Sequence, residues 1–388
     1  MSTILRAANV DRRMIPLLRP LLPSAERLLP YLKRIDAGRI YTNHGPLVRE
    51  FEQRLRCLIG HDLRLATATS GTLALEAAIV SAAPLSPERP LALMPSFTFT
   101  ATALAAERCG YKPYFLDIDP DTWMIDPAKL GMHPMIDKAG LVIPVAPLGR
   151  PVPAAAWAAF SQATGIPVVI DAAGSLSQIF DDPEQFVGSV PVIASLHATK
   201  GFSSGEGGLV LSRDESVIHG CVRALNFGFY GSRESLSAGT NGKMSEYHAA
   251  IGLAELDGWK EKRQRFLAVA DIYQRVAADR GLADRFFCVP EVGISYAILE
   301  ARSVDESLRI RQHLEAASIG SRLWYENGLH LHAHFARTPR DAMGASEKTA
   351  ARLIGLPMAP DLVPDQIVRI LATVADAVFG PARAVQGL

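Results

Sequence analysis

A lysine with possible chemical function stands between an apolar run and a glycine-rich turn. The stretch SLHATKGFSSGEGGLVLS (residues 195–212) contains Lys200 and follows VPVIASLHA, which predicts a buried strand. Ligands of open α/β sheets bind beyond the carboxyl ends of such strands. A lysine that loses its proton on desolvation can attack a carbonyl and form a Schiff base, which arginine cannot do. Lys200 is therefore a candidate nucleophile, and the alternative is a solvated loop lysine.

A second candidate, Asp171, ends the apolar run IPVVID. An aspartate in that place can cap the following turn. Beside a pyridine ring it would instead keep the ring nitrogen protonated and make the ring a better electron sink. The second role predicts a lysine on a neighbouring strand about thirty residues later, and Lys200 follows 29 residues after Asp171 (171 to 200).

Two further features could hold such a cofactor. The turn Ser70-Gly71-Thr72 lies between a predicted strand and a predicted helix, where backbone amides, hydroxyl groups and the positive end of the helix dipole suit a phosphate. Helix capping alone would also select serine or threonine in this turn. Phe99, in PSFTFTAT, is either a core residue or a flat surface on which an aromatic ring stacks.

These residues need a scaffold, and the sequence predicts a three-layer α/β domain with a mostly parallel sheet. From about residue 63, short apolar runs alternate with helical patterns, and most of the runs are apolar throughout, as in strands covered on both faces. Residues 244–279 predict one or two long helices. The later segments predict a smaller α+β domain. We expect a large domain over residues 1–260 and a small domain over residues 261–388.

Composition and charge narrow the choice of partners. Forty basic residues balance forty acidic ones, which argues against nucleic acid or an anionic membrane as a partner. No apolar segment predicts a membrane span. The four cysteines are widely spaced, which argues against a zinc site and predicts small core residues in a reducing, cytoplasmic compartment. The run LHLHAH (residues 329–334) could offer histidine ligands from one face of a strand, but we expect no metal.

Taken in chain order with GTNGKMSEYHAAIGLAEL (residues 239–256), these residues make the chain resemble the DegT/DnrJ/StrS family of sugar aminotransferases. The likeness runs from about Gly45 to residues 356–367. It implies the fold type I architecture of enzymes that use pyridoxal 5'-phosphate (PLP). It also implies that Lys200 carries the cofactor, that Asp171 is the partner of the ring nitrogen and that Phe99 stacks on the ring. The positions that match the family's phosphate contacts are Ser70, Gly71, Thr72, Ser195 and, delivered from the neighbouring subunit, Asn241.

The resemblance implies amino transfer to the keto group of a nucleotide-linked sugar, with glutamate as the donor, by a homodimer with shared sites. Surface polysaccharides or secondary metabolites would be the destination of the aminosugar. One departure is Gly174, which follows DAA where the family often has glutamine or another polar residue. A sugar dehydratase of the same fold is an alternative, although such relatives have histidine in place of Lys200. A non-catalytic binding or regulatory protein and a metal-dependent hydrolase are further alternatives.

Overall fold

The large domain is built on one twisted sheet. A computed structural model describes residues 14–287 and 296–380 of the chain. The strands of this sheet are β1 (Arg64–Ala68), β2 (Leu91–Pro95), β3 (Lys112–Leu116), β4 (Ala139–Val142), β5 (Ile170–Asp171), β6 (Val192–Ser195) and β7 (Gly208–Ser212). Two groups of strands, ordered β3-β2-β4 and β5-β6-β7-β1, are joined by parallel bridges between Val142 and Val168 and between Val145 and Asp171. Only β7 pairs antiparallel with its neighbours, so the predicted mostly parallel sheet is confirmed.

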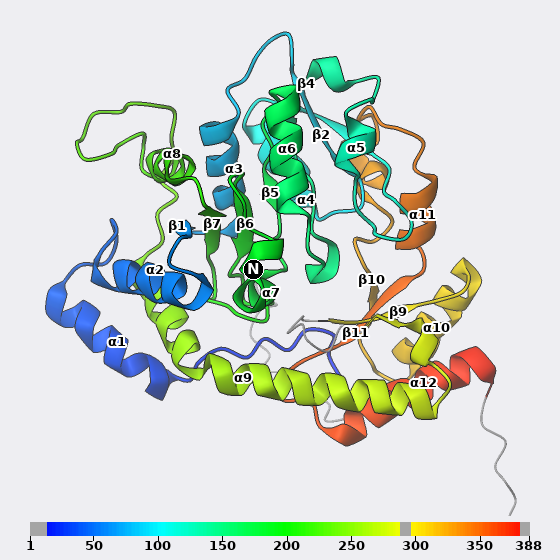
Figure 1. Cartoon of the computed structure of the whole chain (residues 1–388). Helices are drawn as coiled ribbons and strands as arrows, with labels where there is room; N and C mark the ends of the chain where they lie inside the picture. The colour runs from blue at the N-terminus through cyan, green and yellow to red at the C-terminus, as the bar shows by residue number, and fades with distance from the viewer. Residues whose placement is uncertain (1–13, 288–295, 381–388) are drawn as a thin grey trace, which may run out of the picture.

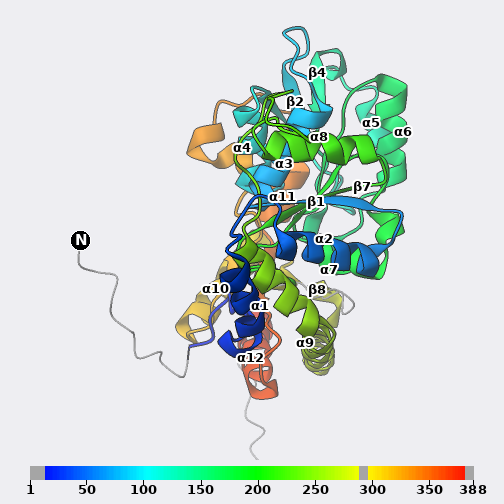
Figure 2. The ribbon, with the colours of Figure 1, turned by 90° about the vertical axis from the view of Figure 1, so that its left-hand side faces the viewer.

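Helices cover both faces of this sheet and complete three layers. One face packs on α3 (Gly71–Ala82), α4 (Thr100–Arg108) and α8 (Glu215–Leu225). The other face packs on α2 (Pro46–Ile59), α6 (Ala154–Thr164) and α7 (Leu176–Asp181). Figure 2 shows the two helical layers on opposite sides of the strands, with α5 (Pro127–Leu130) beside α6. The structure thus confirms the alternation of strands and helices that the sequence predicts.

A single long helix connects the large domain to the rest of the chain. Residues Glu246–Asp279 form α9, which begins at the N-cap Ser245, whose hydroxyl accepts a hydrogen bond from the backbone N–H of His248. The helix packs on α1 (Ala25–Gly38), α2 and α12 and runs along one side of the molecule (Figure 1). Gly252 lies against the ring of Phe51, where any Cβ would approach a ring carbon to 2.6 Å. The predicted domain boundary at residue 260 falls inside α9 and remains a prediction.

The small domain is an antiparallel sheet with helices beside it. Its strands are ordered β10-β11-β9-β8. The elements are β8 (Phe286–Phe287), β9 (Tyr296–Glu300), α10 (Val304–Ala316), β10 (Arg322–Leu323), α11 (Gly344–Ala350), β11 (Leu353–Pro357) and α12 (Pro364–Phe379). A hydrophobic cluster joins α9, α10 and α12 to β9 and β11. This arrangement confirms the expected α+β character.

The segment before α1 links the two domains. Ile15 is buried in the core of the small domain and forms a parallel bridge with Ile319. The chain then passes between the large domain and α9 on its way to α1 (Figure 1). Arg19 forms an ion pair with Asp361 at 2.6 Å. This segment therefore lies against one side of the candidate site.

The cysteines do not all behave as predicted. Cys221 is buried and Cys109 is partly buried, but Cys57 is exposed on the outer face of α2, so the prediction of a core residue is wrong for Cys57. Cys288 lies outside the described residues. Across residues 14–287 and 296–380, no helix has the length and apolar character needed to cross a membrane.

Candidate active site

Lys200 lies in a tight turn directly beyond β6. Its backbone N–H donates to the carbonyl of His197 at 2.9 Å, and the N–H of Ala198 donates to the carbonyl of Gly205 at 2.8 Å. Gly205 has φ +82°, a conformation that favours glycine, and it allows the chain to fold back toward β7. The glycine-rich stretch after Lys200 thus closes the turn that holds the lysine at the carboxyl end of the sheet.

Burial and nearby charges both affect the pKa of the Lys200 amine. Burial lowers the pKa of Lys200, the negative charge of Asp171 opposes that effect, and the positive charge of Arg322 in the small domain adds to it. Lys200 and Asp171 therefore interact electrostatically, as the spacing of 29 residues predicts. Arg322 was not predicted, because its proximity depends on how the small domain lies on the large one.

Asp171 is buried at the end of β5, and both of its carboxylate oxygens accept hydrogen bonds. The backbone N–H of Ala173 donates to Oδ1 at 3.1 Å, and the hydroxyl group of Thr102 donates to Oδ2 at 2.7 Å. The first bond is the turn cap that the sequence allowed as an alternative role. The second comes from another element, α4, and was not predicted.

Four of the five predicted phosphate residues, Ser70, Gly71, Thr72 and Ser195, lie together. Ser70 is the N-cap of α3, and its hydroxyl accepts a hydrogen bond from the N–H of Leu73 at 3.2 Å. Gly71 faces Ser195 so closely that a Cβ at position 71 would lie 3.0 Å from Cβ and 3.2 Å from Oγ of Ser195. Thr72 follows in the first turn of α3, where helix geometry leaves backbone N–H groups without an intrahelical acceptor. We call the amides and hydroxyl groups of Ser70, Gly71, Thr72 and Ser195 the cradle; donors of this kind at a helix N-terminus bind small anions.

The strands bring this cradle next to Asp171. Within the sheet, Asp171 pairs with Ile193, and the N–H of Ser195 donates to the carbonyl of Ala173 at 3.3 Å. Phe99 is the N-cap of α4 and is 67% exposed, so it is not the core residue that one alternative predicted. Its free ring surface is available to a ligand. Lys200, Asp171, Phe99 and the cradle therefore belong to one region at the carboxyl ends of the strands.

Asn241 is placed differently. It forms an antiparallel bridge with Asn226, and its exposed side chain accepts a hydrogen bond from Lys243 Nζ at 2.8 Å. The carbonyl of the next residue, Gly242, accepts from the N–H of Thr69 at 2.8 Å. The segment thus contacts the Ser70 turn of its own chain, while the side chain of Asn241 remains at the surface.

The three histidines of residues 330–334 do not lie on a strand. His330 and His334 occur in short 3-10 turns, Leu329–Leu331 and Ala333–Phe335, and His332 lies between these turns, which corrects the strand prediction. His330 is buried and its Nδ1 lies 2.6 Å from the hydroxyl of Ser96, while its Nε2 lies 3.1 Å from a carboxylate oxygen of Glu347. Within the described part of the chain, no group of three or more His, Cys, Asp or Glu residues could hold a metal ion.

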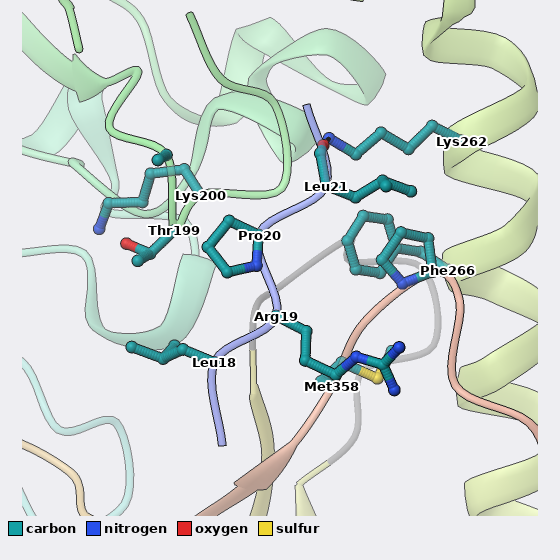
Figure 3. A pocket seen from close by; sticks show the side chains of 11 residues that line it. Leu18, Arg19, Pro20, Leu21, Thr199, Lys200, Lys262, Phe266 and Met358 are labelled. Atoms are coloured by element: carbon teal, nitrogen blue, oxygen red, sulfur yellow. Dashed lines mark hydrogen bonds between the residues drawn. The ribbon is translucent and has the colours of Figure 1, made fainter. Parts of the chain in front are cut away.

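A small cavity borders the lysine turn on the side of the N-terminal segment. Figure 3 shows Lys200 and Thr199 on one side of that segment and Lys262 and Phe266 of α9 on the other. Lys262 Nζ donates to the carbonyl of Leu21 at 2.7 Å and also pairs with the buried Glu255, which fixes the segment to α9. The segment therefore shields one side of the lysine turn from solvent.

The residues fit a cofactor that has an aldehyde, a cationic ring nitrogen and a phosphate. Lys200 has an amine whose pKa is lowered by burial, and Asp171 offers an anchored anion. The missing Cβ of Gly71 lets the start of α3 approach Ser195 closely, which brings the Ser195 hydroxyl group to the amides of the first turn. Gly174, where the sequence departs from the family pattern, has no atom within 4 Å of a would-be Cβ, so the chain leaves open space there.

Comparison with known proteins gives consistent matches over most of the chain. Residues 24–375 match the model of the DegT/DnrJ/EryC1/StrS aminotransferase family. Protein Rv3402c of Mycobacterium tuberculosis (strain ATCC 25618 / H37Rv) is 33% identical over 374 residues, which cover 94% of this chain and 90% of that protein.

Two solved structures are also similar. One, assigned as a PLP-dependent aminotransferase from Bacillus cereus ATCC 10987, is 31% identical and has a TM-score of 0.85. The match covers 93% of this chain and 99% of that one. The structure of DesI in the presence of its TDP-sugar product is 28% identical with a TM-score of 0.81, and the match covers 95% of this chain and 94% of that one.

Proposed function

Because the chain belongs to the DegT/DnrJ/EryC1/StrS aminotransferase family, we propose that it transfers an amino group to the keto carbon of a nucleotide-linked sugar. Family membership itself makes the chain a PLP-dependent sugar aminotransferase. Our proposal adds the nucleotide-linked ketosugar as the acceptor and glutamate as the donor. It also covers the roles of individual residues, a dimer with shared sites, a cytoplasmic location and a product destined for surface polysaccharides or secondary metabolites.

One observation carries the proposal: a lysine whose pKa is lowered by burial lies within electrostatic reach of a doubly hydrogen-bonded aspartate, beside an anion cradle. A solvated loop lysine would not have this environment. A sugar dehydratase of this fold would not need Lys200. The combination is what amino transfer through a carbonyl cofactor requires.

Lys200 would act twice in the reaction. Its Nζ would attach the cofactor at rest and, once the donor has displaced it, would accept the proton from the donor's α carbon. Burial helps both tasks, since a neutral amine is the form that acts as nucleophile and base. The N-terminal segment beside the lysine turn would limit the access of water to this amine.

The other residues of the site would hold and orient the cofactor. PLP, when bound, supplies a carbonyl for the donor nitrogen and a ring that takes up negative charge. Asp171 would hold a proton on the ring nitrogen, since its carboxylate is anchored by Thr102 and Ala173. Phe99 would pack on the ring face. The amides and hydroxyl groups of Ser70, Thr72 and Ser195 would bind the phosphate.

Exposed apolar side chains near Asn241 in the sequence support the dimer. Phe227, Tyr230, Leu236 and Tyr247 are each more than two-fifths exposed, and they lie before and after Asn241 in the chain. A second copy of this chain would cover them in a two-fold interface. In that assembly Asn241 would reach the phosphate of the partner's site.

The proposal is tested with a panel of nucleotide-linked ketosugars and a panel of amino donors. Products are analysed by mass spectrometry, and the cofactor absorbance is followed with each donor alone. We expect one ketosugar to gain an amino group in place of its keto oxygen, with glutamate as the best donor. Removal of water from a sugar without nitrogen transfer would support the dehydratase instead.

A further inference from the structure

A buried chain of hydroxyl groups ends on the carboxylate of Asp171. The Oγ1 atoms of Thr98 and Thr102 lie 2.7 Å apart, and Thr102 Oγ1 lies 2.7 Å from Asp171 Oδ2. Thr98 and Thr102 are 2% and 0% exposed, so water does not compete for these bonds. Thr98 therefore reaches the Asp171 carboxylate only through Thr102.

The direction of both hydrogen bonds follows from the chemistry of the groups. An ionised carboxylate only accepts, so Thr102 must donate its single hydroxyl hydrogen to Asp171. Thr102 then has only lone pairs to offer Thr98, so Thr98 must be the donor in the second bond. The chain runs from Thr98 through Thr102 to Asp171, and each bond polarises the next toward the carboxylate.

The same turn also holds the backbone of Phe99. The backbone N–H of Thr102 donates to the carbonyl of Phe99 at 3.1 Å in the first turn of α4. The N–H of Thr98 donates to the carbonyl of Ser96 at 3.0 Å, and the hydroxyl of Ser96 is bound by His330. Thr102 is thus bonded to Asp171 through its side chain and to Phe99 through its backbone.

We propose that Thr102, supported by Thr98, is a positioning residue that holds the Asp171 carboxylate in fixed register with the Phe99 ring. The inference rests on the proposed function, in which Asp171 meets the ring nitrogen and Phe99 meets the ring face. Oδ1 is held by the backbone N–H of Ala173 and Oδ2 by Thr102, so the carboxylate cannot rotate freely. Threonine suits this task because its β-branched side chain is restricted at χ1.

The test compares Thr102→Val, which keeps the shape and removes the donor, with Thr102→Ser, which keeps the donor. The readout is the absorbance spectrum of the cofactor-loaded enzyme over a pH series, without donor or sugar, together with the dissociation constant for PLP. Thr102→Val should shift the pH midpoint of the spectrum and slow amino transfer by about 10–100-fold, as loss of an orienting partner does elsewhere. Thr102→Ser should remain close to the wild type.

Two further variants keep the test decisive. Thr98→Val should shift the midpoint in the same direction by a smaller amount, and it decides the matter if Thr102→Val does not fold. Thr373→Val in α12 removes a hydroxyl group that bonds only a backbone carbonyl and should change nothing. A wild type that takes up no PLP at Lys200 would refute the proposed function. A wild type that takes it up, with both valine variants unchanged in spectrum and rate, would refute the positioning role alone.

Discussion

Gly71 and Ser195 lie so close that a Cβ at position 71 would be 3.0 Å from Ser195 Cβ. Gly71 begins α3 just beyond the carboxyl end of β1, and Ser195 ends β6; β7 lies between these two strands in the sheet. Contacts this short are rare between real side chains, so an added methyl group must displace Ser195 or the helix start. This close approach leaves no room for a side chain at position 71 and fixes the start of α3, where we place the cofactor phosphate.

Gly71→Ala should therefore weaken PLP binding about tenfold, corresponding to about 1.4 kcal/mol, with little loss of fold stability. The backbone of Gly71 needs no left-handed conformation, and alanine favours helices. The dissociation constant is measured by absorbance titration of the apoenzyme. Gly344→Ala is the matched control, because Gly344 also begins a helix and its Cβ would meet no atom within 4 Å. Equal PLP affinities in the two variants would show that the phosphate does not bind at the start of α3.

Lys200→Ala should lower amino transfer by at least about 10²–10⁴-fold, the usual contribution of a positioned base, since it also removes the nucleophile. The apoenzyme of this variant should still bind PLP through the cradle and Phe99. Turnover is measured by product mass spectrometry with saturating donor. A rate near that of the wild type would contradict both roles of Lys200.

The burial of Lys200 has a cost in stability that depends on pH. Burial lowers the pKa of Lys200 in the folded chain below its ordinary value of 10.5, so the unfolded chain binds the proton more tightly. Apoenzyme stability should therefore rise as pH rises from the folded pKa to 10.5. Lys200→Met should stabilise the apoenzyme near neutral pH, and this gain should shrink toward pH 10.5. Thermal unfolding of both proteins between neutral pH and pH 10.5 measures this gain in stability. A gain that grows with pH would contradict the assigned direction.

Asp171→Asn should slow amino transfer by about 10²–10³-fold, as loss of one preorganised electrostatic contact does in other enzymes. Asparagine has nearly the same shape, so the fold should persist. Since Asp171 opposes the lowering of the Lys200 pKa, its neutralisation should lower that pKa further. The pH dependence of Lys200 acylation in the apoenzyme reports this shift. An unchanged rate and an unchanged acylation profile would leave Asp171 as a turn residue only.

A mixture of two inactive chains tests the shared site. Lys200→Ala keeps Asn241, and Asn241→Asp keeps Lys200. In the proposed shared site, Asn241→Asp would place a negative charge beside the cofactor phosphate of the partner. If sites are shared, one site of the mixed dimer has neither defect, and activity should return after subunit exchange. Each variant mixed with itself is the control. No recovery in a proven mixed dimer would place Asn241 outside the partner's site.

The sequence predicted the main elements well, because their apolar patterns are local. Buried strands such as β2 and β6 are apolar at nearly every position, and α9 has uninterrupted helical spacing. The direction of β7 had no such signal, since an antiparallel strand in this sheet has the same composition as a parallel one. The histidine run was read as a strand because alternation suggested it, whereas His330 is held in a turn by Ser96 and Glu347.

In the site, too, local sequence patterns predicted some relations, whereas relations that depend on tertiary packing were not predicted. The order and spacing of Asp171 and Lys200 indicated their interaction, because neighbouring strands bring such positions together. Thr98 and Thr102 are four residues apart, but their role depends on α4 lying against the end of β5, which is a tertiary relation. Arg322, in the small domain, lowers the Lys200 pKa. No sequence pattern near Lys200 indicated this interaction.

The attachment point of the cofactor is the central claim, and reduction followed by peptide mapping tests it most directly. The enzyme loaded with PLP is treated with borohydride, digested and analysed by mass spectrometry. We expect the reduced cofactor on the peptide that contains Lys200, and no labelled peptide from Lys200→Ala. Labelling of Lys243, or of any lysine other than Lys200 in the wild type, would contradict the account.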